Sequence, residues 1–126
     1  MTKWTTPIVV AAVVVALAGI GALYSARHAA PAWTTPFQAV MLDSGIVYFG
    51  KLSGYDTRNP VLTDVYYVQS QQDPKTRQIT NQLVRLSTLW HGPDRMILNP
   101  THIVAVEPVA TVSTVATLIE EAEKKK

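Results

Sequence analysis

The sequence contains no cysteine, which excludes disulfides, thiolate catalysis and cysteine-ligated metal sites. It also has no excess of either charge in its larger part, because residues 36–126 hold nine Lys and Arg and nine Asp and Glu. A general nucleic-acid binder usually carries a basic face, since neutralising phosphates supplies most non-specific affinity. Composition alone therefore argues against nucleic-acid binding.

Motifs that carry catalysis are missing as well. The three histidines, His28, His91 and His102, have no metal-ligand spacing, and the chain has no phosphate-binding glycine loop and no dinucleotide fingerprint. Ser87, His91 and Asp94 could be imagined as a triad, but such trios occur by chance and no nucleophile elbow accompanies this one. We predict a non-enzymatic protein with no metal, no cofactor and no evident small-molecule substrate.

One long hydrophobic run is present, near the N-terminus. Pro7–Tyr24 contains no charged residue and is dominated by Val, Ala, Ile and Leu. As a helix it would be about 27 Å long, close to the hydrocarbon thickness of a bilayer. Tryptophans flank the run, as expected at membrane–water interfaces. The sequence predicts a transmembrane anchor over residues 1–24, with these anchor residues: Trp4, Pro7, Tyr24 and Trp33.

A cleaved signal peptide is the alternative interpretation of this segment. The apolar run exceeds the usual length of a signal-peptide hydrophobic region, and the best small residue after it, Ala30, is followed by proline. We therefore predict a retained, single-pass anchor in a bacterial-type cell membrane. Lys3 and the N-terminal amine precede the run and Arg27 follows it, so one charge favours a cytoplasmic N-terminus and an extracytoplasmic domain.

Residues 25–36 are small and polar and include two prolines, which predicts a linker. Beyond it, runs rich in β-branched and aromatic residues predict six strands: Ala39–Leu42, Ile46–Leu52, Val61–Val68, Asn81–Leu86, Met96–Leu98 and Ile103–Val106. We expect a loop over Gln69–Gln78 and a turn at Trp90–Asp94. Five or six short strands at this spacing indicate a small, mainly β barrel or sandwich over residues 37–110.

The hydrophobic period changes near the C-terminus. Four apolar residues follow the i, i+3, i+4, i+7 spacing of one helix face: Val115, Leu118, Ile119 and Ala122. The polar face has mixed charge, so the helix is expected to pack on its own barrel or on a neighbouring protein rather than on a membrane surface. The sequence predicts a short amphipathic helix over residues 111–126.

Residues 40–65 read VMLDSGIVYFGKLSGYDTRNPVLTDV, which resembles the first motif of the Sm and Sm-like proteins. The matching positions include Gly45, Gly50, Asp56, Asn59 and Asp64. Gly45 is expected in the first turn, and Gly50 where a strongly bent second strand allows close packing. Met96–Pro108 resembles the second motif, two short strands joined by a tight turn. The resemblance implies a strongly bent, SH3-like barrel, with another small barrel as the alternative.

The chain departs from the family where RNA would bind. The second motif's Arg-Gly or Lys-His falls near Leu98, Asn99 and Pro100, which cannot supply the donors that uridines need. Sm-like domains generally assemble into rings through their edge strands. The resemblance therefore implies that Met96–Leu98 pairs with Val61–Val68 of a neighbouring copy.

Apolar and aromatic residues are the candidates for a protein interface: Tyr66, Tyr67, Trp90, Met96, Leu118 and Ile119. Adjacent tyrosines in a strand point to opposite faces, so one of the first two is expected in the core. The leading hypothesis is an anchored, oligomerising or accessory subunit whose partners are the bilayer and either its own copies or a larger membrane complex. The alternative is a membrane-tethered RNA binder using Lys51, Arg58 and Arg95.

Overall fold

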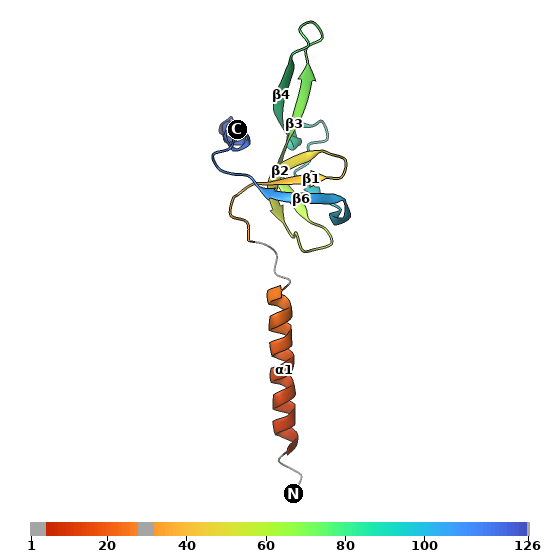
Figure 1. The fold of residues 1–126 in the computed structure, drawn as a ribbon, viewed down its shortest axis with the longest axis vertical. Coiled ribbons are helices and arrows are strands. Elements are labelled where there is room, and N and C mark those ends of the chain that lie inside the picture. Colours follow the sequence, from red (N-terminus) through yellow and green to blue (C-terminus); the bar gives the residue numbers. More distant parts are fainter. Residues whose placement is uncertain (1–4, 28–31, 126) are drawn as a thin grey trace. The chain divides into compact units, whose positions relative to one another are not determined.

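The computed structural model describes residues 5–27 and 32–125, in two compact units, Met1–Pro31 and Ala32–Lys126 (Figure 1). The first unit holds one helix, α1 (Thr5–Arg27). The second holds, in chain order, β1 (Gln38–Leu42), β2 (Val47–Ser53), β3 (Val61–Gln72), β4 (Ile79–Arg85), the 3₁₀ turn η1 (Leu86–Thr88), β5 (Arg95–Ile97), the 3₁₀ turn η2 (Pro100–His102), β6 (Ile103–Pro108) and α2 (Thr114–Lys124).

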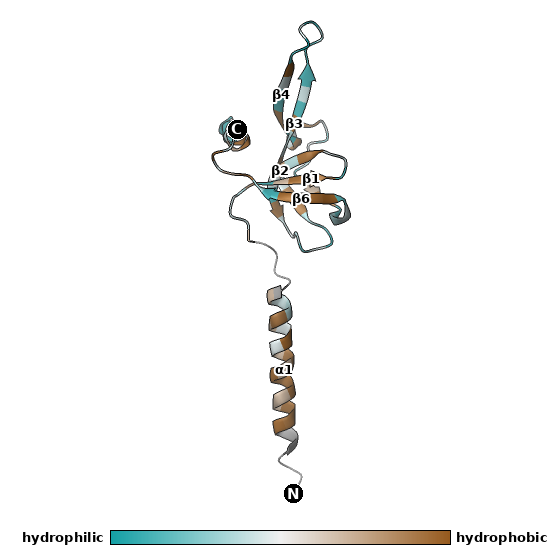
Figure 2. Cartoon of the chain, in the orientation of Figure 1, coloured by the Kyte–Doolittle hydropathy of each residue, from teal (hydrophilic) through white to brown (hydrophobic). Residues whose placement is uncertain are grey.

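Helix α1 is long and apolar enough to cross a membrane. Its segment Ile8–Ala26 has 19 residues and a mean hydropathy of 2.4 (Figure 2). A signal sequence meets the same criteria of length and composition. The helix continues to Arg27, three residues beyond the predicted end of the anchor at residue 24. Trp4 lies outside the described residues.

The second unit is mainly β, as predicted. Its six strands form one antiparallel sheet in the order β4-β3-β2-β1-β6, with β5 paired to β3. The loop predicted over Gln69–Gln78 is wrong in part, because β3 continues to Gln72 and β4 begins at Ile79. Side chains on both faces of this outer hairpin are exposed, so no alternation of apolar and polar residues marked it as strand.

A β-bulge divides β3 into two parts. Phe49 pairs with Tyr66 and Lys51 with Thr63, so Asp64 and Val65 together lie opposite the single residue Gly50. Asp64 has a φ of 49°, in the left-handed region that aspartate tolerates better than most residues. The bulge lets one edge of β3 serve two partners, since β5 pairs before it and β4 after it.

The core is a cluster of buried aliphatic side chains from three strands and two connecting segments: Val40, Leu52, Leu62, Val65, Leu86 and Leu98. Among the buried side chains of the described residues, Gln38 is the polar exception. Its amide nitrogen donates to the Thr35 carbonyl oxygen at 2.7 Å, and its Oε1 accepts from the Leu52 amide at 2.9 Å. This side chain satisfies a backbone donor just beyond the bulge, where the β2 ladder is irregular.

The pairing of β5 corrects one expectation. Val61, Leu62 and Thr63 pair with Ile97, Met96 and Arg95 of the same chain. The predicted pairing of Met96–Leu98 with this part of a neighbouring copy is therefore wrong, because that edge of β3 is already occupied.

Helix α2 begins later than the predicted boundary at residue 111. Ser113 is its N-cap, and the Ser113 Oγ accepts from the Ala116 amide at 3.1 Å. Ile119 is buried, whereas Leu118 remains partly exposed. One side of the helix therefore packs on its own domain, the first of the two arrangements that its mixed charge suggested.

Candidate functional site

A charged cluster forms around the bulge residue Asp64. Its Oδ2 lies 2.9 Å from the Lys51 Nζ on β2, and its Oδ1 lies 3.2 Å from an Arg85 guanidinium nitrogen at the end of β4. The bulge aims the carboxylate so that both cations reach it, one from each neighbouring strand. Both ion pairs help to hold Asp64 in its left-handed backbone conformation, which is otherwise unfavourable.

Two aromatic rings extend this cluster. The Lys51 Nζ lies 5.4 Å from the centre of the Phe37 ring, and the Arg85 guanidinium carbon lies 5.7 Å from that of Tyr66. The two rings meet edge to face with centres 6.3 Å apart. Each cation therefore contacts both a carboxylate and an aromatic face, which fixes its position more firmly than an isolated surface ion pair would.

The Tyr66 hydroxyl is the unusual member of the group. The side chain is 0% exposed, and within the described residues its hydroxyl has no hydrogen-bond partner. Burial raises the pKa of Tyr66, because the phenolate would be poorly solvated there. Tyr66, which was predicted as an interface residue, lies inside the fold of the single chain.

Alkaline pH is expected to destabilise the domain. The pKa of Lys51 is also raised, chiefly by its hydrogen bond to Asp64. Both groups hold their protons more tightly when folded, so their stabilising effect is complete below the unfolded pKa values and is lost above about pH 10. Urea unfolding at increasing pH should show this loss, and it should be smaller in Tyr66→Phe. An equal loss in that variant would contradict the role of Tyr66.

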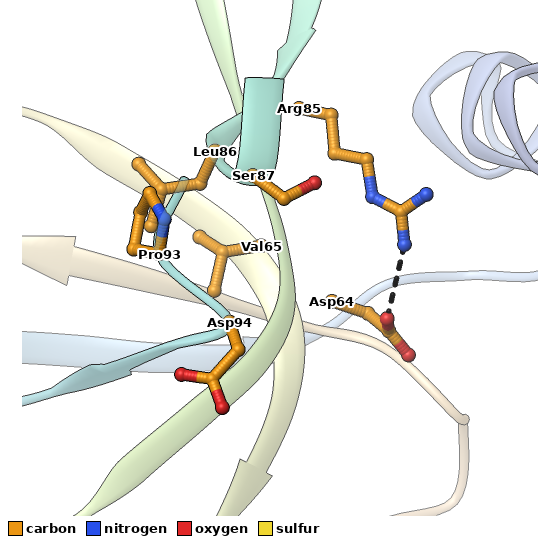
Figure 3. Close-up of a pocket in the computed structure, with 7 residues that line it drawn as sticks. All are labelled: Asp64, Val65, Arg85, Leu86, Ser87, Pro93 and Asp94. Atoms are coloured by element: carbon orange, nitrogen blue, oxygen red, sulfur yellow. Dashed lines mark hydrogen bonds and ion pairs between the residues drawn. The ribbon is translucent and has the colours of Figure 1, made fainter. Parts of the chain in front are cut away.

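A pocket of about 260 Å³ lies beside the cluster (Figure 3). Its lining residues come from β3, β4 and the segment before β5: Asp64, Val65, Arg85, Leu86, Ser87, Pro93 and Asp94. Ser87 and Asp94 therefore share this pocket, but His91 is not among the lining residues, and Asp94 is paired with Arg95 at 2.8 Å. The arrangement does not assemble the triad considered from the sequence.

Neither a metal site nor a strong RNA surface emerges from the described residues. Within residues 5–27 and 32–125, no three His, Cys, Asp or Glu side chains gather as metal ligands. Of the three cations considered for RNA, Lys51 pairs with Asp64 and Arg95 with Asp94, so carboxylates offset their charge. The positions of these charged side chains therefore give no further support to RNA binding.

The other residues proposed for an interface have contrasting environments. Trp90 is fully exposed in the turn before β5, at 101%. Tyr67 and Met96 are partly buried against the core, and the Tyr67 ring contacts that of Tyr48, with centres 6.2 Å apart. Ile119, also predicted as an interface residue, is buried in the single chain, with only 2% of it exposed.

The positions of the Sm-like motif are found in turns and at the bulge. Gly45 has a φ of 82° in the turn after β1, and its amide donates to the Leu42 carbonyl oxygen. Asp56 and Asn59 are exposed in the connection from β2 to β3.

Trp33, predicted at a membrane interface, packs against the core, and its ring centre lies 5.8 Å from that of Tyr55. Trp33 thus also has a part in the fold of the domain.

The chain matches no protein-family model, and no curated protein matches it. Its function must therefore be inferred from its own residues.

Proposed function

We propose that this chain is a single-pass membrane protein whose β domain assembles with copies of itself as a structural or accessory part of a membrane complex. The observation that carries the proposal is a pair of strands with unsatisfied outer edges. Among the described residues, β5 pairs with β3 alone and β6 with β1 alone. Each carries an exposed apolar side chain, Ile97 on β5 at 65% and Val104 on β6 at 64%.

Unpaired strand edges are templates for further pairing, because their backbone donors and acceptors need partners. The edge of β5 on one copy would pair with the edge of β6 on the next, which places Ile97 near Val104 of the adjoining copy. This contact joins two different surfaces, so repeating it gives a ring where the rotation closes. This β5–β6 pairing takes the place of a β5–β3 pairing between copies, which is blocked because that edge of β3 already pairs with β5 of the same chain.

The proposal includes an Sm-like, strongly bent barrel. Its support is the motif at residues 40–65, the bulge opposite Gly50, and the short connection through η2 between β5 and β6. We also propose that α1 is retained as the anchor. The N-terminal side of the helix carries one more positive charge than the C-terminal side, which favours an extracytoplasmic β domain.

Charge on either edge strand is expected to break the assembly. Full-length protein in detergent should elute as an oligomer by size-exclusion chromatography with light scattering. Ile97→Lys and Val104→Lys should each give monomers, because an ammonium group cannot be buried against an apolar strand without a partner. The thermal unfolding of both variants should change little, since both side chains face solvent in the single chain.

Ile79→Lys is the matched control, because Ile79 is similarly exposed but lies on β4. It should leave the oligomer intact. A strictly monomeric wild-type protein that co-purifies with nothing would remove the proposal, as would oligomers that all three variants preserve.

A further inference from the structure

A groove follows the outer edge of β4 on the side facing α2. Two adjoining cavities, of about 410 and 270 Å³, make up this groove. They share four lining residues: Gln82 and Leu83 from β4, and Ala122 and Lys125 from α2 and its C-terminal end. The combined space is in the range of ordinary ligand pockets in proteins.

The backbone of β4 forms one wall of the groove. All five residues from Asn81 to Arg85 line it, although side chains in a strand alternate between two faces. Consecutive residues can share one cavity when it runs along the strand edge. Within the described residues β4 pairs with β3 alone, so this edge retains free backbone donors and acceptors.

Helix α2 forms the opposite wall. Leu118, Glu121, Ala122 and Lys125 follow the spacing of one helix face and line the smaller cavity. A strand edge with a helix beside it is a geometry that accepts one extended peptide as an added strand. Because α2 closes the outer side, the occupant must be a single chain with no sheet of its own behind it.

The chemistry of the larger cavity favours a carboxylate. Arg85 and Lys125 line it, together with Thr88 and the buried Tyr66, and no Asp or Glu is among its lining residues. Asp64 already forms an ion pair with Arg85. Lys125 is therefore the second cation that can attract a carboxylate in the cavity.

We propose that this groove binds an extended peptide of a partner protein, added as a strand to β4. An apolar side chain of the peptide would contact Leu83 and Leu118, and a carboxylate would lie near Arg85 and Lys125. The carboxylate comes either from an Asp or Glu side chain or from the C-terminus of the peptide. The site uses neither β5 nor β6 and is independent of the proposed assembly.

The probe is a display library of random peptides with free C-termini, selected on the full-length protein in detergent micelles. Selected sequences should combine β-branched residues with an acidic group. Each selected peptide is then synthesised with a free and with an amidated C-terminus, and binding is followed by fluorescence anisotropy. A loss only on amidation identifies a terminal carboxylate, and a loss only on Asp→Asn or Glu→Gln replacement identifies a side chain.

Two variants of the protein test the groove, and one serves as control. Ala122→Phe fills the groove and should abolish binding, whereas Thr117→Phe, on the exposed side of α2, should leave it unchanged. Lys125→Gln should weaken binding of the carboxylate-bearing peptides by about tenfold. The same change should not lower the unfolding temperature, because the Lys125 side chain is exposed.

Amide hydrogen exchange should show protection at Asn81–Arg85 when peptide binds. Selection of no peptide, or of peptides whose binding survives Ala122→Phe, would overturn the proposal. So would protection confined to other strands. If Ala122→Phe instead dissociated an oligomer formed without peptide, the groove would hold a second copy and the partner-peptide proposal would be wrong.

Discussion

Replacing Gly50 by alanine is expected to destabilise the β domain strongly. An added Cβ would lie 2.7 Å from the Leu62 Cγ and 2.8 Å from the Thr63 carbonyl oxygen. Leu62 is fully buried and the carbonyl belongs to the backbone, so neither atom can move aside cheaply. Overpacking of this kind costs about 1–3 kcal/mol or more. The gain from a stiffer unfolded chain, about 0.4–1 kcal/mol, is smaller.

The unfolding temperature and urea midpoint of full-length protein measure this effect. Gly50→Val should abolish the folded domain, since its side chain is larger still. Gly19→Ala is the matched control, because nothing lies within 4 Å of a Cβ added there. A Gly50→Ala domain as stable as the wild type would show that β2 and β3 approach each other less closely than described.

Two arginines in the middle of α1 are expected to release the protein from membranes. Val14 and Leu17 lie near the centre of the apolar segment Ile8–Ala26. Each arginine at the centre of a spanning helix costs about 2.5–3.5 kcal/mol of insertion free energy. The double variant Val14→Arg, Leu17→Arg should therefore move from the membrane fraction to the soluble fraction after alkaline extraction.

Ser25→Arg is the control for this experiment. A charge near the end of the helix can extend its side chain toward water, so this variant should stay with the membrane. N-terminal sequencing of the wild-type protein completes the test. Mature protein recovered in the soluble fraction with a new N-terminus beyond Ala30 would show that the segment is removed, and retention of the anchor would be contradicted.

The strands of the buried part of the sheet were predictable from the sequence, because their runs of β-branched and aromatic residues are typical of strands. Segments such as Val61–Val68 and Ile103–Val106 therefore appear close to their predicted positions. The outer part of the β3–β4 hairpin has no buried face and hence no such pattern. Its polar residues resembled a loop until cross-strand pairing could be seen.

The candidate sites depend on distant contacts and were largely beyond prediction. The cluster of Lys51, Asp64 and Arg85 joins three strands through a bulge, and residue spacing does not encode which strands are neighbours. The lone hydroxyl of Tyr66 is likewise a property of the packed fold. The one available signal was the pair of adjacent tyrosines, which correctly placed one of them in the core.

The outer, polar part of the β3–β4 hairpin determines how far the hairpin extends from the rest of the β domain. Beyond the pairing of Val68 with Leu83, four further cross-strand pairs lead to the turn, and all their side chains are exposed. At about 3.3 Å per residue, they carry the tip about 13 Å farther along the strand direction. Lengthening the hairpin at its tip would thus alter its reach while leaving the hydrophobic interior and the groove beside α2 unchanged.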